Sequence, residues 1–106
     1  MPAFHVVRLG NAAMIWADRP LGGDVAPQLH EALDGLIAEG ATPLVVDLVR
    51  VSAIDDGIVA VLAAAASQAG GRGRALELRM ANGYRYAVGG PAQLRQAIAR
   101  AFPTAA

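Results

Sequence analysis

The chain has 106 residues, of which 55% are hydrophobic and 17% are charged, and its formal net charge at pH 7 is zero. A chain of this length and composition forms one globular domain and lacks the signature of a disordered protein. It contains no cysteine, which excludes disulfides, thiolate metal sites and a cysteine nucleophile, and which fits a reducing cytoplasm.

The hydrophobic residues do not form a membrane-spanning pattern. The longest apolar run, residues 58–66, is far shorter than the roughly 20 residues that cross a bilayer. His5 and Arg8 interrupt any apolar core of a signal peptide. The arginines are scattered singly in a neutral chain, so we do not expect nucleic-acid binding. The sequence therefore predicts a soluble, cytoplasmic domain without membrane insertion.

The first part of the chain predicts a β-hairpin followed by a helix. Two β-prone runs, at residues 4–9 and 12–17, are separated by Gly10-Asn11, a pair that suits a hairpin turn. Asp24 is expected to open a helix that Gly40 ends, because apolar residues recur at the spacing of one helical face. The residues on that face are Val25, Leu29, Ala32, Leu33, Leu36 and Ile37.

The rest of the chain alternates strands and helices. Residues 43–48 form a short apolar run that is typical of a buried strand. The elements expected after it are a helix over 57–68, a turn at 70–74, a strand at 75–80, a hairpin through Asn82-Gly83 into 84–88, and a last helix from Pro91. This order predicts a single α/β domain, residues 1–106, with a mixed central β-sheet and three to four helices.

The predicted second helix is apolar on every side. Ile58 and Leu62 belong to a face that would supply the core. The other sides are apolar as well, at Val59, Ala60, Ala63, Ala64 and Ala66. A helix that is apolar all round is normally buried all round. We therefore expect part of this surface to contact a partner; the alternative is that alanines on a surface simply favour helix.

Asp55 and Asp56 stand at the start of this helix, and their chemistry allows three interpretations. One of them could cap the helix by accepting a hydrogen bond from a free backbone N–H. The pair could belong to a metal or phosphoryl site, but such a site needs further carboxylates or a lysine, and the chain has no lysine. It could act in acid–base catalysis, although adjacent residues on one loop rarely face each other across a substrate. We expect capping, no metal, no cofactor and no enzymatic activity.

A longer stretch around this pair resembles the central motif of STAS domains. Residues 44–80 read LVVDLVRVSAIDDGIVAVLAAAASQAGGRGRALELRM, and residues 22–40, GGDVAPQLHEALDGLIAEG, are similar to the first helix of that family and its entry. The family motif is an apolar strand ending in Asp-Leu, then Asp-Ser-Ser/Thr-Gly, an apolar helix, a Gly-rich turn and a strand. Asp47-Leu48, Asp55 and Gly57 match it. The segment 84–88 has no counterpart in this pattern.

The resemblance implies a STAS-like fold and a role in protein interaction. In anti-sigma factor antagonists, a branch of this family, the serine or threonine before the loop glycine is phosphorylated by an anti-sigma factor with an ATPase-fold kinase domain. Here the loop is one residue shorter and Asp56 occupies that position, so no hydroxyl remains there. Asp56 carries about one negative charge where a phosphoserine would carry nearly two. Ser52 is the nearest hydroxyl and is expected to lie in a strand or link.

The resemblance also implies a partner and a contact surface. We expect the domain to bind an anti-sigma factor with an ATPase-fold kinase domain, in bacterial transcription regulation. The expected contact residues are Asp55, Asp56, Gly57, Ile58, Val59 and Ala63. The alternatives are an accessory subunit of an ABC-type lipid transporter, which would contact the transporter ATPase, and a scaffold module that contacts another STAS protein. Homodimer formation also stays open.

Overall fold

The structure of the protein, a computed structural model, describes residues 2–102. Its centre is a five-stranded mixed sheet in the order β1-β2-β3-β4-β5. The strands are β1 (His5–Leu9), β2 (Ala12–Trp16), β3 (Leu44–Asp47), β4 (Leu76–Arg79) and β5 (Arg85–Val88). The three central strands run parallel, and each outer strand pairs antiparallel with its neighbour. The predicted α/β class and mixed sheet are therefore confirmed.

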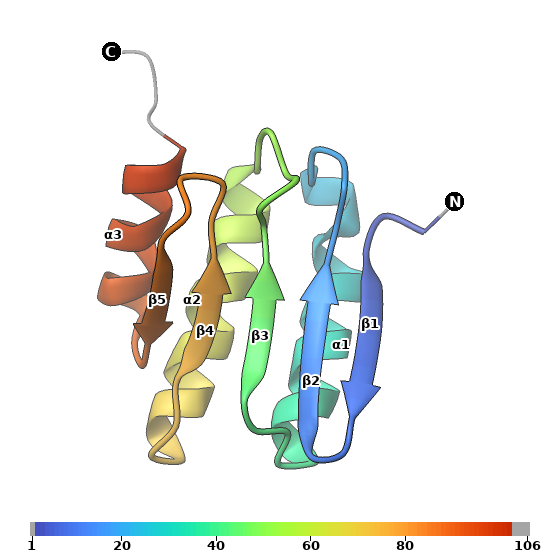
Figure 1. Cartoon of the computed structure of the whole chain (residues 1–106), viewed down its shortest axis with the longest axis vertical. Helices are drawn as coiled ribbons and strands as arrows, with labels where there is room; N and C mark the ends of the chain where they lie inside the picture. The colour runs from blue at the N-terminus through green and yellow to red at the C-terminus, as the bar shows by residue number, and fades with distance from the viewer. Residues whose placement is uncertain (1, 103–106) are drawn as a thin grey trace.

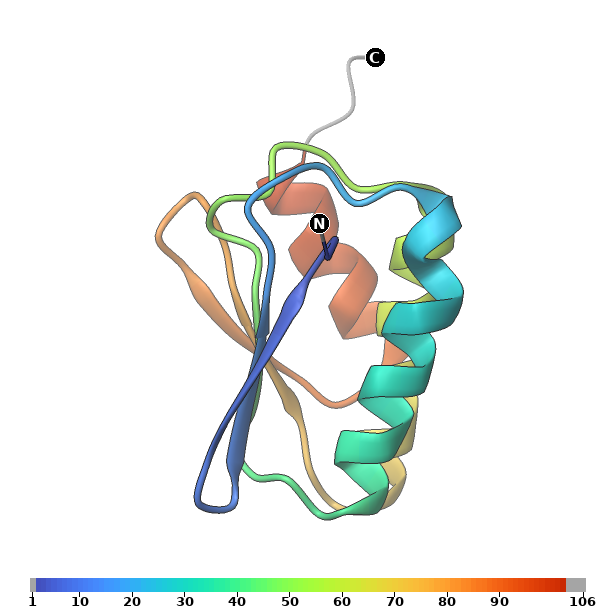
Figure 2. The same ribbon diagram turned by 90° about the vertical axis from the view of Figure 1, so that its right-hand side faces the viewer.

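The helices lie on one face of this sheet and leave the other face open, as Figures 1 and 2 show. They are α1 (Ala26–Ala38), α2 (Asp56–Gly71) and α3 (Pro91–Ala101), with a short 3-10 helix, η1 (Gly23–Val25), before α1. The fold thus has two layers, and every helix buries its apolar side against the sheet. No helix in this described part is long and apolar enough to cross a membrane.

Both predicted hairpins form. Gly10 and Gly83 each have a positive φ, +60° and +85°, which glycine adopts without steric cost. The segment 84–88, which the STAS motif did not place, contains the edge strand β5 (Arg85–Val88), and Tyr84 lies just before it. The first helix differs slightly from expectation, since Asp24 lies within η1 and α1 begins at Ala26.

Helix α2 is the middle helix of the layer, between α1 and α3, which explains its all-round apolar sequence. Its side chains contact α1, α3 and the sheet, so three of its sides are covered within the domain. Six of its residues are buried, at positions 58, 62, 63, 65, 66 and 69. Because α2 packs against a helix on each side, its apolar character alone does not require a partner.

Candidate functional site

The candidate site is built by two loops that meet where β2 and β3 end. Parallel strands end at the same edge of a sheet, so the loops that follow them come together there. The Leu21 N–H donates to the Ala53 carbonyl at 3.0 Å, and the Asp55 N–H donates to the Leu21 carbonyl at 3.1 Å. Leu21 and Ile54 thereby form a short parallel bridge beyond the main sheet. This bridge fixes the loop before α2 against the loop before α1.

Asp55 connects these loops through its side chain. Its Oδ1 accepts a hydrogen bond from the Asp56 N–H at 2.9 Å, and its Oδ2 accepts one from the Gly23 N–H at 2.8 Å. Asp55 is also the N-cap residue of α2, with extended φ and ψ of −88° and 159°. The predicted capping role is therefore confirmed, and it belongs to Asp55.

Asp56 occupies a different environment although it is the next residue. It is the first residue of α2, its side chain is exposed, and within residues 2–102 its carboxylate has neither a hydrogen-bond donor nor an ion-pair partner. A carboxylate in the first turn interacts favourably with the positive end of the helix dipole. The Asp56 carboxylate is therefore exposed to solvent at the positive end of the α2 dipole.

Gly57 lies in the first turn of α2, opposite the loop before α1. A Cβ at this position would lie 3.5 Å from the Gly23 Cα and 3.8 Å from the Ala26 Cβ, which is ordinary van der Waals contact. Gly57 is half-buried. The packing between these two elements therefore leaves room for a small side chain at position 57.

Two of the expected contact residues lie inside the domain. Ile58 is 0% exposed and Ala63 is 3% exposed, and both belong to the hydrophobic core. The expectation that these side chains contact a partner is therefore wrong for this structure, because the sheet and the neighbouring helices already cover them. Val59 is half-buried and packs against the edge of the core.

The outer side of α2 carries a row of exposed residues. Residues spaced four apart lie on the same side of a helix. The exposed residues at that spacing are Asp56, Ala60 and Ala64, and Ser67 and Gln68 continue the line. We call these five residues the α2 strip. It offers one negative charge, then the two methyl groups of Ala60 and Ala64, and then the polar side chains of Ser67 and Gln68.

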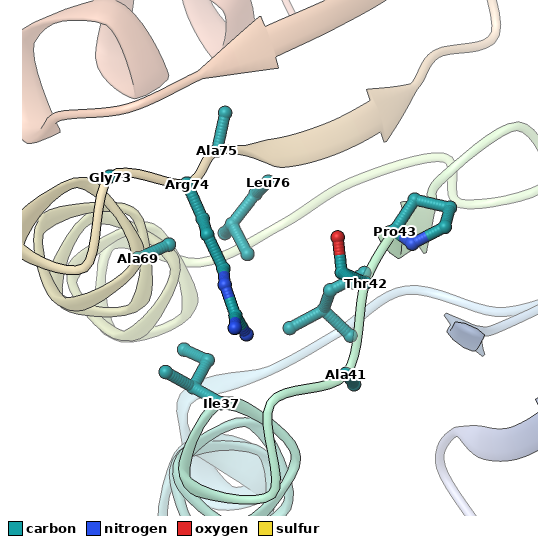
Figure 3. Close-up of a pocket in the computed structure, with 10 residues that line it drawn as sticks. Ile37, Ala41, Thr42, Pro43, Ala69, Gly73, Arg74, Ala75 and Leu76 are labelled. Atoms are coloured by element: carbon teal, nitrogen blue, oxygen red, sulfur yellow. The ribbon is translucent and has the colours of Figure 1, made fainter. Parts of the chain in front are cut away.

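One hollow in the surface lies at the opposite end of the sheet. A cavity of about 230 Å³ opens between the ends of α1 and α2, with Ile37 on one side and Ala69 on the other. The Arg74 side chain extends into this gap beside Thr42, as Figure 3 shows. Its lining within the described chain includes one charged residue and no carboxylate or histidine, so it lacks an acid–base pair. Across residues 2–102, no group of three histidine, aspartate or glutamate side chains is placed to hold a metal ion.

Nearly the whole of the described chain matches one family of known domains. A family model described as "Mlab, STAS domain" matches residues 4–102 of the chain. The chain belongs to the STAS family. A comparison with curated proteins gives no match.

A solved structure shows the same STAS fold. It is described as the anti-sigma factor antagonist SpoIIAA in its unphosphorylated form, and it aligns with a TM-score of 0.64. The alignment covers 72% of this chain and 71% of the other, at 17% sequence identity. At that identity the likeness establishes the fold and not the partner.

The structure of this STAS domain also contains a relationship that the sequence did not reveal. The hydrogen bond from Gly23 to Asp55 joins residues that are 32 positions apart. The order of the two parallel strands predicts only that these loops share one edge of the sheet. Ser52, the nearest hydroxyl, is exposed in the same loop but lies outside any helix or strand.

Proposed function

We propose that this STAS domain is a non-enzymatic docking module for an ATPase-fold protein, with an anti-sigma factor kinase as its first partner class. The observation that carries the proposal is an exposed, unpartnered Asp56 at the start of the α2 strip, followed by the small side chains of Ala60 and Ala64. The SpoIIAA-like fold supports it, since that protein is described as an anti-sigma factor antagonist. The proposed contact comprises the loop at 55–57, Val59 and the exposed residues of α2.

The chemistry of this surface favours a partner that presents a cation. Asp55 is occupied by two backbone N–H groups, so Asp56 is the carboxylate that is free to pair with an arginine or lysine of the partner. A charge-assisted hydrogen bond of this kind strengthens when the surrounding surface becomes desolvated. Ala60 and Ala64 allow the partner backbone to come close enough to exclude water.

Under this proposal, the residue before Gly57 is not switched on and off by phosphorylation, because an aspartate cannot gain or lose a phosphoryl group in the way a serine does. The partner would therefore meet the same surface at all times, and regulation would depend on the amounts of the two proteins. Asp56 would belong to the contact itself.

The proposal is tested by affinity purification with the full chain as bait. Wild type, Asp56→Arg and Asp34→Arg are compared in lysate of the native cells, and retained proteins are identified by mass spectrometry. Asp34 is an exposed carboxylate on α1 whose reversal changes the net charge by the same amount. The expected result is an ATPase-fold protein that wild type and Asp34→Arg retain and Asp56→Arg loses. Retention by all three variants would overturn the proposed contact.

A second candidate is an accessory subunit of an ABC-type transporter. The matching family model is named for Mlab and not for an anti-sigma factor antagonist, and this observation favours STAS roles outside sigma-factor control. Such a role requires no phosphorylatable residue at position 56. The same purification separates the candidates, because the retained ATPase would be a transporter subunit in this case and a kinase-type anti-sigma factor in the first.

A further inference from the structure

The free edge of β1 is the most exposed apolar part of the sheet. Val6, Val7 and Leu9 are 42%, 45% and 81% exposed. No element within residues 2–102 lies beyond this strand, which forms one border of the sheet (Figure 1). An edge strand presents a row of unpaired backbone N–H and C=O groups, and these can pair with another strand.

The hydrogen bonds of β2 show which β1 groups are free. The Ala13 N–H donates to the Pro43 carbonyl at 3.1 Å, so it points toward β3 and away from β1. Ala13 and its β1 neighbour Arg8 are therefore a non-hydrogen-bonded pair. Because this pattern alternates along an antiparallel pair, the backbone groups of Val6 and Arg8 point outward.

This edge lacks the devices that usually prevent strand pairing. Native edges are often protected by proline, lysine, a bulge or a covering element. β1 has an unbroken register with β2 over all five residues and contains neither proline nor lysine. Its one charge, on Arg8, already pairs with Glu39, and hydrogen bonding from Arg8 holds the pKa of the Glu39 carboxyl below its usual value.

We propose that β1 pairs antiparallel with β1 of a second copy of this chain, which joins two sheets into one continuous sheet. A two-fold axis at Val7 places Val6 opposite Arg8 of the other copy, and both residues have outward backbone groups. Each such pair exchanges two hydrogen bonds, and the axis generates two pairs. His5 then faces Leu9 of the other copy, so no two like charges stand opposite one another.

The side chains fit this register as well as the backbone does. Val7 shares the open face of the sheet with its neighbour Met14, so the two copies of Val7 would extend one apolar row across the junction. The zero net charge of the chain adds no long-range repulsion between copies. A five-residue pairing is short, and the dimer is therefore reversible and forms at micromolar or higher concentration.

The dimer leaves the proposed partner surface free. The α2 strip lies on the helical layer, at the middle of the domain, whereas β1 lies at the border of the sheet (Figures 1 and 2). The two inferences are therefore independent, and loss of one interaction leaves the other measurable. A dimer would carry two α2 strips.

Analytical ultracentrifugation of the full chain tests the dimer. Wild type is compared with Val7→Lys and Val49→Lys over micromolar to millimolar concentrations. Val49 is a matched control because it is also a valine, is 47% exposed, and lies in the loop after β3. The average mass of wild type and Val49→Lys should rise toward two chains. Val7→Lys should stay monomeric because two lysines would meet at the axis.

Cysteine cross-linking tests the register. A non-hydrogen-bonded pair has Cα atoms about 4.5 Å apart, within the range that a disulfide bridges. The chain has no cysteine, so Val7→Cys and Val49→Cys each carry one thiol. Under mild oxidation Val7→Cys should form covalent dimers at least tenfold faster than Val49→Cys. Equal rates, or a wild-type chain that stays monomeric throughout, would overturn the proposal.

Discussion

Asp55 accepts a hydrogen bond from the Gly23 N–H at 2.8 Å and so fastens the loop before α1 to the first turn of α2. The same carboxylate caps α2 through the Asp56 N–H. One side chain thus holds together two segments that are far apart in sequence. The side chain of its neighbour Asp56 takes no part in this contact and is exposed to solvent.

The two aspartates should therefore respond differently to removal of their charge. Asp55→Ala loses the cap and leaves the Gly23 N–H without its acceptor, so the free energy of unfolding should fall by about 1–2 kcal/mol. Asp56→Ala should change it by less than about 0.5 kcal/mol. Urea unfolding followed by circular dichroism measures both values. A larger loss for Asp56→Ala would contradict this assignment.

The elements and their order were predictable from sequence because each has a local signal. Glycines and the Asn82-Gly83 pair mark the turns, and period 3.6 marks the faces of α1 and α3. Ile58 was placed on the core face of its helix by this spacing, but the burial of Ala63 was not predictable in this way. Periodicity shows that a helix is covered on several sides, but it does not distinguish a neighbouring helix from a partner protein.

A close approach between α2 and the loop before α3 gives a second prediction. A Cβ at Gly70 would lie 1.9 Å from the Gly89 carbonyl oxygen, whereas a Cβ at Gly71 would meet nothing within 4 Å. Gly70→Ala should lower the free energy of unfolding by about 1–3 kcal/mol through overpacking. Gly71→Ala should raise it by up to about 1 kcal/mol through helix propensity.

Thermal unfolding checks this pair of glycine variants. For a domain of this size, each kcal/mol shifts Tm by roughly 4–8 °C. The two alanine variants should therefore melt on opposite sides of wild type. Equal Tm values would show that α2 and the loop before α3 can move apart at little cost in free energy. In sequence, Gly70 and Gly89 each stand in a Gly-Gly pair that signals a turn, so neither revealed the contact.

Substitutions on the outer and inner sides of α2 should separate effects on partner binding from effects on the stability of the domain. Ala64→Arg places a bulky cation on the α2 strip, where it has room, and should weaken binding of the ATPase-fold partner at least tenfold with little change in Tm. Ala63→Arg introduces a charge at a buried position and should prevent folding. Calorimetric titration and circular dichroism measure the two effects. Full binding by Ala64→Arg would exclude the α2 strip as the contact.

Restoring a hydroxyl at position 56 tests the fixed-charge part of the account. If the recovered partner is an anti-sigma factor kinase, Asp56→Ser should bind it more weakly, because the carboxylate of the contact is lost, and should accept a phosphoryl group from ATP. Wild type should accept none at this position. Intact-mass spectrometry after incubation with ATP and the partner measures this. Phosphorylation of wild type at Ser52 would instead show a relocated switch.

The most direct measurement is hydrogen exchange of the domain with and without its recovered ATPase-fold partner. The account predicts slower exchange in residues 52–60, around Asp56 and the first turns of α2, and unchanged exchange on the open face of β4 and β5. Protection confined to the open face of the sheet, with residues 52–60 unchanged, would contradict it.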